Sequence, residues 1–207
     1  CCRQNGVRGG SATVHFPIWH QEIEDILVLK NNKGTEDNRV RKLDYSIQIS
    51  ELFYKRFIND EDVSLFSPHD VDNLYDVYGS PEFDALYEKY ERNKKIPRKT
   101  IGAQKLFMEL LKERAETGRI YIMNIDHCNT HSSFKDKVYM SNLCQEITLP
   151  TKPVQHIDDP KGEIALCILS AINLGMIKDK EELEELCDLS VRALDEIIDY
   201  QEYPVEA

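Results

Sequence analysis

The sequence lacks long hydrophobic runs and an excess of positive charge. None of its 207 residues belongs to an apolar stretch approaching the roughly 20 residues that span a bilayer. No signal peptide precedes the first charged residues, so a cytoplasmic protein is expected. Lys and Arg number 26 against 37 Asp and Glu, a formal net charge of −11. Without a basic stripe to neutralise phosphates, we expect binding to neither nucleic acid nor membranes.

Cysteine is present, but without the spacing of a disulfide scaffold or a zinc site. The six cysteines are scattered along the chain, which favours free, catalytic or redox-cycling thiols in a reducing compartment. His127, Cys128 and His131 are competent metal ligands, but no second pair at zinc-like spacing follows them. We therefore expect no metal site, and expect the polar groups of this segment to brace the end of a strand.

The hydrophobic pattern predicts alternating helices and strands, hence an α/β fold. Helices are predicted over 18–29, 43–58, 81–96, 102–116 and 181–200. Strands are predicted over 64–67, 119–126 and the apolar part of 161–175. No repeat, low-complexity segment or linker divides the chain, so residues 1–207 are expected to form part of one domain, with no separate second domain.

The most informative stretch is Tyr139-Met-Ser-Asn-Leu-Cys-Gln-Glu-Ile-Thr-Leu-Pro150. In an extended segment side chains alternate between two faces, so Asn142, Cys144 and Glu146 would point the same way. An amide, a thiol and a carboxylate would then converge, which suits redox chemistry on a polar, hydroxylated substrate. The alternative is that Asn-x-Cys-x-Glu arises by chance, since a buried cysteine is usually a small core residue.

The sequence as a whole resembles that of the catalytic large (α) subunit of class I ribonucleotide reductases. The resemblance covers essentially the whole chain, and its motifs stand in a consistent order. They are Gly6-Val-Arg-Gly-Gly-Ser-Ala-Thr13, Val28-Leu-Lys-Asn-Asn32, Leu65-Phe-Ser-Pro-His-Asp70, the run from Thr117 to Asn129, Ser141-Asn-Leu-Cys-x-Glu-Ile147, Leu149-Pro-Thr-Lys152 and the run from Gly162 to Gly175.

The resemblance implies a fold and a set of site residues. The chain would be part of a ten-stranded α/β barrel, with residues 139–150 as a loop carrying the radical cysteine into its centre. Cys144 would be the transient thiyl and Glu146 the general base. Asn142 would bind the ribose hydroxyls, and Leu143 would also line the substrate site. Cys167, on a strand within 161–175, would be one of two thiols that supply reducing equivalents.

Residues 1–13 form a glycine-rich segment for which an ordinary turn is the alternative interpretation. Glycine permits positive φ and close backbone approach, and Arg8 can form forked hydrogen bonds. By resemblance this is the specificity loop between the effector site and the substrate base. Its implied residues are Cys2, Gln4, Arg8, Gly9 and Gly10.

The resemblance also implies cofactors and partners. No cofactor would be bound directly; the radical would come from the metal cofactor of a small (β) subunit, with thioredoxin or glutaredoxin as reductant. Nucleoside triphosphates would act as effectors in deoxyribonucleotide synthesis, and ribonucleoside diphosphates would be the substrates. An α dimer and complementary α segments are expected, and the chain alone is expected to be inactive.

The sequence is also compatible with rival origins and activities. The chain is either one product of a split or intein-interrupted gene, for which Cys1 is suggestive, or a partial sequence. A glycyl-radical enzyme would share the barrel and thiyl chemistry, although no glycyl-radical loop is present. A non-catalytic remnant or interaction fragment would keep the same fold without turnover.

Overall fold

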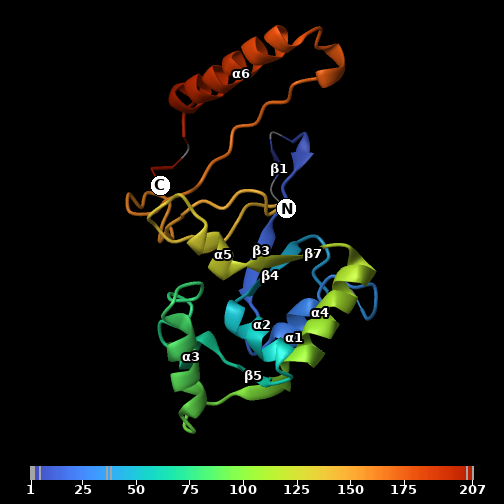
Figure 1. Ribbon diagram of the computed structural model, residues 1–207, viewed down its shortest axis with the longest axis vertical. Helices are drawn as coiled ribbons and strands as arrows, with labels where there is room; N and C mark the ends of the chain where they lie inside the picture. Colours follow the sequence, from blue (N-terminus) through green and yellow to red (C-terminus); the bar gives the residue numbers. More distant parts are fainter. Residues whose placement is uncertain (1–2, 5, 36, 38, 204, 207) are drawn as a thin grey trace. The chain divides into compact units, whose positions relative to one another are not determined.

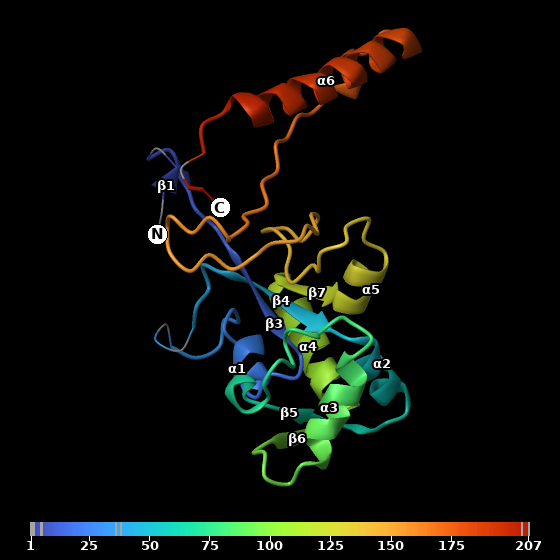
Figure 2. The same ribbon diagram turned by 90° about the vertical axis from the view of Figure 1, so that its left-hand side faces the viewer.

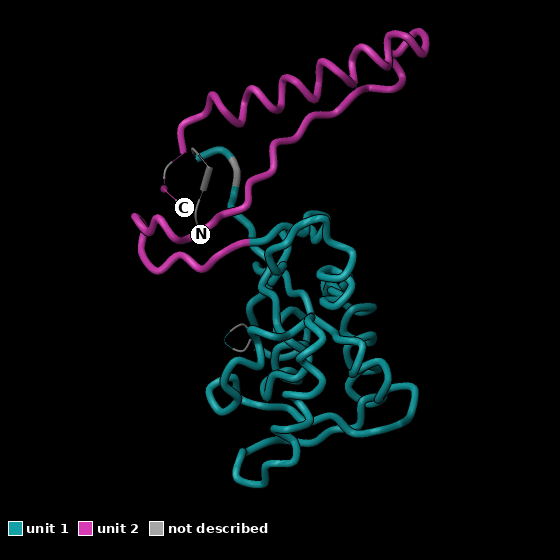
Figure 3. The backbone as a smooth tube through the Cα atoms, turned by 60° about the vertical axis from the view of Figure 1, so that its left-hand side comes forward, with its two compact units in different colours: residues 1–150 teal, residues 151–207 magenta. Residues whose placement is uncertain are grey.

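The computed structural model describes residues 3–4, 6–35, 37, 39–203 and 205–206. The chain divides into two compact units, residues 1–150 and residues 151–207 (Figure 3). Most of the regular structure and the buried core belong to the first unit. The second unit consists largely of extended chain and one long helix.

A three-stranded parallel sheet is central to the first unit. It contains β3 (Thr13–Pro17), β4 (Asp44–Ile49) and β7 (Ile120–Asn124), in the order β3-β4-β7. The register places His15 beside Ser46, and Ser46 beside Tyr121. Parallel neighbours require long crossover connections, and here these connections contain the helices. The mixed α/β character predicted from the sequence is confirmed.

Helices α1 (Ile23–Leu27), α2 (Glu51–Ile58) and α4 (Ala103–Thr117) pack together beside this sheet (Figures 1 and 2). Ile47 of β4 and Leu106 of α4 are completely buried in the core they share. The prediction of a helix over 102–116 is confirmed, and so is its end at Thr117-Gly118, where Gly118 adopts a φ of 65°. Glycine has no Cβ to clash in this left-handed conformation.

Two of the predicted helices differ in the structure. Residues 43–58 are not one helix: β4 ends at Ile49, and α2 begins only after the extended residue Ser50. The reason is the alternation within 44–49, which buries an apolar side chain at every second position of a strand. The helix predicted over 18–29 is shorter, since α1 spans only Ile23–Leu27.

The antiparallel pair β5 (Asp62–Leu65) and β6 (Lys99–Gly102) belongs to the same core as the helices, whereas a second core includes Phe66, directly after β5. The short 3-10 helix η2 (Pro68–Asp70) and α3 (Phe83–Arg92) follow β5. Tyr87 of α3 is buried, and its hydroxyl donates to the Ser64 carbonyl at 2.7 Å. The strand predicted at 64–67 is confirmed in part, while 81–96 is less solvated than expected because Phe83 and Tyr87 enter this core.

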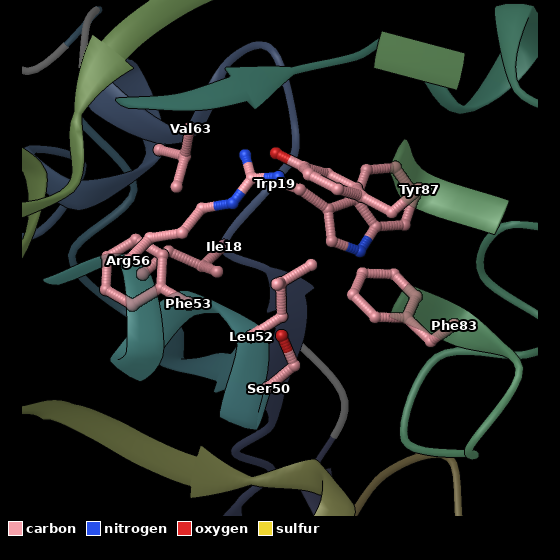
Figure 4. A pocket seen from close by; sticks show the side chains of 9 residues that line it. All are labelled: Ile18, Trp19, Ser50, Leu52, Phe53, Arg56, Val63, Phe83 and Tyr87. Atoms are coloured by element: carbon pink, nitrogen blue, oxygen red, sulfur yellow. The ribbon is translucent and has the colours of Figure 1, made fainter. Parts of the chain in front are cut away.

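An ion pair joins α2 to α3 at the edge of this core. Arg56 and Glu91 meet through two hydrogen bonds, with Nη1–Oε1 at 2.6 Å and Nη2–Oε2 at 2.5 Å. The Arg56 guanidinium also lies 5.1 Å from the centre of the Tyr87 ring. Figure 4 shows Arg56 and Tyr87 around a small apolar cavity, together with Trp19 and Phe83.

Residues 151–207 contain little regular structure before the long helix α6 (Lys180–Tyr200). Asp179 caps this helix, since its Oδ1 accepts from the Glu182 backbone N–H at 2.8 Å. The helix predicted over 181–200 is therefore confirmed. Upstream lie the 3-10 helix η3 (Leu174–Met176) and one isolated bridge between Lys152 and Glu163.

The strand predicted within 161–175 is wrong. Beyond the bridge at Glu163, residues 164–173 form no strand, and Cys167 is exposed. A strand requires a neighbouring backbone to complete its ladder, and the described part of residues 151–207 supplies only that bridge. No helix among the described residues is long and apolar enough to cross a membrane.

Candidate active site

Strands β3 and β4 of the sheet carry apolar side chains on one face and polar side chains on the other. Val14, Phe16, Tyr45 and Ile47 belong to the core that contains the helices. Residues that alternate with them point to the opposite face, and they are polar: Thr13 and His15 on β3, Ser46 and Gln48 on β4. Although Ser46 and Gln48 are polar, both are completely buried. The segment from Tyr139 to Ile147 covers them through hydrogen bonds.

Strand β3 holds this segment at two points. The Thr13 hydroxyl donates to the Leu143 carbonyl at 2.5 Å. His15 Nε2 lies 3.1 Å from the Ser141 carbonyl oxygen and 3.4 Å from the Ser141 backbone nitrogen. His15 Nδ1 is buried without a hydrogen-bond partner among the described residues. Burial lowers the pKa of His15, and its hydrogen bond to Ser141 opposes this effect.

Strands β4 and β7 supply the other attachments. Gln48 Nε2 donates to the Tyr139 carbonyl at the start of the segment. The Ser46 hydroxyl donates to Gln145 Oε1 at 2.5 Å, and Gln145 Nε2 donates to the Ile122 carbonyl at 2.6 Å. All three strands of the sheet therefore hold the segment that carries Cys144.

The segment is a closed turn, which corrects the extended conformation expected for residues 139–150. Asn142 Oδ1 accepts from the Ile147 backbone N–H at 3.0 Å, and the Gln145 N–H donates to the Asn142 carbonyl at 3.2 Å. Gln145 has a φ of 63°, in the left-handed region. Asparagine side chains compete with strand pairing in this way by bonding to nearby backbone. Simple alternation therefore does not decide where Asn142, Cys144 and Glu146 point.

The closed turn presents a thiol and a carboxylate at an anchored position. Cys144 is a free cysteine with an exposed side chain, and the Glu146 side chain is also exposed. Leu143 between Asn142 and Cys144 is half-buried, with its carbonyl fixed by Thr13. Chemically, such a turn can offer a sulfur for one- or two-electron chemistry beside a proton acceptor.

Two other segments with predicted site residues are the stretch around Cys167 and the glycine-rich segment near the beginning of the chain. Cys167 is a free, exposed thiol in residues 151–207, so its relation to Cys144 stays a prediction. Near the beginning of the chain, β1 (Arg3–Gln4) pairs antiparallel with β2 (Arg8–Gly9), and Gly6 turns between them with a φ of 74°.

The register of this hairpin sets Gln4 opposite Arg8. Gly9 and Gly10 are exposed, and Cys2 lies outside the described residues. The hairpin fits both an ordinary turn and a specificity loop, and its role in specificity remains a prediction.

The histidines after β7 belong to helix α5 (Ile125–Thr130) and its end. The rings of His127 and His131 contact edge to face, with centroids 5.4 Å apart. Cys128 is half-buried, and burial raises the pKa of its thiol. Within the described ranges, no group of three or more His, Cys, Asp or Glu could hold a metal ion.

Sequence reasoning missed the residues that hold the Cys144 turn. Thr13, His15, Ser46 and Gln48 each alternate with apolar neighbours, a period-two signal that the helix predicted over 43–58 obscured for Ser46 and Gln48. Gln145 could not be found this way, because its role depends on contacts with two strands far away in the sequence.

Comparison with known proteins identifies the family to which the chain belongs. The sequence-family model of the ribonucleotide reductase barrel domain matches residues 1–207. A ribonucleoside-diphosphate reductase subunit alpha from Buchnera aphidicola (Schizaphis graminum) is 58% identical over 99% of this chain and 27% of its own length. The proteins of that name from Haemophilus influenzae and phage T4 are 56% and 45% identical, over 100% and 99% of this chain.

The chain spans about 28% of the length of such relatives. The match nevertheless covers every motif described above, including the turn with Cys144. The chain therefore belongs to the ribonucleotide reductase barrel-domain family.

Proposed function

We propose that this chain is part of the catalytic barrel of a ribonucleoside-diphosphate reductase α subunit, in which Cys144 is the radical-bearing residue. The observation that carries the proposal is the anchored turn, which exposes Cys144 and Glu146 while three strands hold its backbone. The names of the relatives support the substrate class, ribonucleoside diphosphates. The three parallel strands would belong to a ten-stranded barrel completed by other α segments.

Replacing the ribose 2′-hydroxyl by hydrogen is difficult because hydroxide is a poor leaving group. A thiyl radical at Cys144 would take the 3′ hydrogen atom, leaving a carbon radical from which the 2′ oxygen departs as water. Glu146, two residues away and exposed, would accept the 3′-hydroxyl proton as general base. The hydrogen atom returned to C3′ at the end would restore the thiyl.

Asn142 would bind the ribose hydroxyls and so hold the reacting carbon in place. Its Oδ1 accepts from the Ile147 N–H, so we assign substrate binding to the Nδ2 donors. The same side chain would then shape the turn and orient the substrate. Leu143 would contact the substrate beside it.

The overall replacement of the 2′-hydroxyl by hydrogen, with release of water, consumes two electrons and two protons. Cys167 and a second cysteine, supplied by a segment outside this chain, would provide them and become a disulfide. Thioredoxin or glutaredoxin would reduce that disulfide by thiol exchange. The exposure of Cys167 supports access by such a reductant.

The radical would be generated by the metal cofactor of a small (β) subunit, so no cofactor need bind this chain directly. Nucleoside triphosphate effectors would act through the β1–β2 hairpin and its residues Gln4 and Arg8. We expect the assembled α subunit to be a dimer.

Reconstitution tests the proposal. The chain is mixed with complementary N- and C-terminal α segments, the small subunit, a dithiol reductant and a nucleoside triphosphate effector, and deoxyribonucleotide formation is measured. We expect turnover that Cys144→Ser abolishes. Cys187→Ser serves as the matched control, because Cys187 is also an exposed thiol, lies on α6 and has no role in the proposed reaction.

Co-purification of the segments without turnover would instead favour a non-catalytic remnant or interaction fragment. Turnover that survives Cys144→Ser would exclude Cys144 as the radical site.

A further inference from the structure

We propose that Gln145 is a positioning residue for Cys144, acting through a side-chain amide that fastens the turn to β4 and β7. The inference deepens the proposed function, and it concerns the residue that directly follows the radical cysteine. Gln145 Oε1 accepts from the Ser46 hydroxyl at 2.5 Å, and its Nε2 donates to the Ile122 carbonyl at 2.6 Å. One amide thus bridges two neighbouring strands.

The backbone of Gln145 indicates that this arrangement is held by its contacts. Its φ of 63° lies in the left-handed region, which is unfavourable for an L-residue other than glycine or asparagine. Such a conformation persists where the surroundings determine it. Here the side chain of Gln145 reaches the sheet, while those of Cys144 and Glu146 on either side are exposed.

The chemistry of the bridge requires an amide. Its two partners are a hydroxyl donor, Ser46, and a carbonyl acceptor, Ile122, so the bridging group must both accept and donate. Ser46 is completely buried on the central strand and has no solvent to replace a lost partner. A carboxylate of the same shape would keep the acceptor but would set negative charge against the Ile122 carbonyl.

Because Gln145 directly follows Cys144, the bridge also fixes the position of the Cys144 backbone. The sulfur can take a substrate hydrogen only from one position, and a displacement of about 1 Å can cost on the order of 100-fold in rate. Releasing Gln145 would free the part of the turn next to Cys144, while Thr13 and Asn142 would still hold its other parts. We therefore expect a loss in kcat with little change in KM.

The test compares Gln145→Glu and Gln145→Gly with the unsubstituted chain in the reconstituted assembly. Gln145→Glu replaces the Nε2 donor by a negatively charged oxygen, and Gln145→Gly removes the bridge while favouring the left-handed backbone. Gln104→Glu is the matched control, because Gln104 is exposed on α4 and also donates to a carbonyl, that of Phe57 at 3.2 Å. Hydrogen exchange of residues 139–150 and alkylation of Cys144 are measured beside kcat and KM.

We expect both Gln145 variants to raise exchange of the turn about tenfold, as loss of one or two net hydrogen bonds implies. Exchange within α4 should stay unchanged, kcat should fall at least tenfold, and the control should match the unsubstituted chain. Unchanged exchange and kcat in Gln145→Gly would overturn the inference, since the backbone turn alone would then hold Cys144. If the unsubstituted assembly shows no turnover, the proposed function fails, and the exchange measurement still decides the role of Gln145.

Discussion

At the residue scale, His15 shows how burial on the polar face of the sheet changes the pKa of a titratable side chain. Its Nε2 lies within hydrogen-bond distance of the Ser141 backbone, and its Nδ1 is buried without a partner among the described residues. A proton on Nδ1 would place a charge where neither solvent nor an acceptor compensates it. This is why burial lowers the pKa of His15 below its ordinary value near 6.5.

We predict that His15 makes folding stability fall as the pH falls below about 6.5. In that range the unfolded chain binds the proton first, so acidification favours unfolding. The unfolding temperature is measured at pH 7.5 and 5.5 for the unsubstituted chain and for His15→Gln. The unsubstituted chain should lose more on acidification, while His20, whose pKa burial also lowers, contributes equally to both. Equal losses in the two proteins would contradict the prediction.

The described cysteines differ in how exposed their thiols are. Cys144, Cys167 and Cys187 are exposed, whereas Cys128 is half-buried and burial raises the pKa of its thiol. The thiolate is the reactive form, so Cys128 should react most slowly of the four with iodoacetamide at pH 7.5. Peptide mass spectrometry gives each rate, with Cys187 as the exposed reference. A Cys128 rate matching that of Cys187 would contradict the assignment.

At the scale of elements, two glycines adopt the left-handed conformation: Gly118 at the end of α4 and Gly79 in the turns before α3. Gly118 ends α4 with open space where a Cβ would lie, whereas a Cβ at Gly79 would lie 2.7 Å from Ile125 Cγ1. The first position is therefore limited by backbone conformation alone, and the second also by packing.

We predict that Gly118→Ala lowers the free energy of unfolding by about 1 kcal/mol. Gly118→Asn should cost less, because asparagine tolerates this conformation. Gly79→Ala should cost about 2–3 kcal/mol, since it adds overpacking to the strain. Urea unfolding of the three variants checks this order, and a Gly79→Ala variant as stable as Gly118→Asn would refute it.

The ion pair between α2 and α3 gives a second prediction at this scale. The side chains of Arg56 and Glu91 are only 12% and 19% exposed, so Glu91→Gln leaves a largely buried guanidinium without its charge partner. We expect a loss of about 2 kcal/mol in stability, measured by urea unfolding. Glu51→Gln breaks the exposed pair with Lys55 and should cost less than about 0.5 kcal/mol. Similar losses for both would show that the buried pair contributes no more than the surface one.

At the scale of the whole molecule, the two units differ in how their backbone is bonded. β4 pairs on both sides and is the central strand of the sheet. Residues 164–172, in contrast, make no backbone–backbone hydrogen bond within the described residues, and Ile164, Leu166 and Leu169 expose large apolar side chains.

We predict that amides of 164–172 exchange fastest in the isolated chain and those of β4 slowest, because exchange follows local opening. Adding the complementary α segments should slow exchange at 164–172, since the proposed barrel would pair this stretch. Hydrogen-exchange mass spectrometry measures both, and α6 provides a reference whose backbone is already bonded within the helix. Unchanged exchange at 164–172 in a complex that restores turnover would argue against barrel pairing there.

Prediction from the sequence succeeded where structure is local. Helix α4 follows from its apolar periodicity and from Gly118 at its end, and the helix predicted over 181–200 matches α6. It failed for 43–58, where apolar spacing fits a helix although the chain forms a strand, a break at Ser50 and then a helix. It failed again for 161–175, where an apolar run cannot form a strand without a partner.

By itself, the sequence determined the α/β class, the family motifs and the identity of Asn142, Cys144, Glu146 and Cys167 as candidates. Only the tertiary structure decided how the turn with Cys144 is shaped and what holds it. The contacts that do so join residues far apart, such as Thr13 with Leu143 and Ser46 with Gln145. They exist because parallel pairing of β3, β4 and β7 places alternate polar side chains on one face, and no local pattern encodes that register.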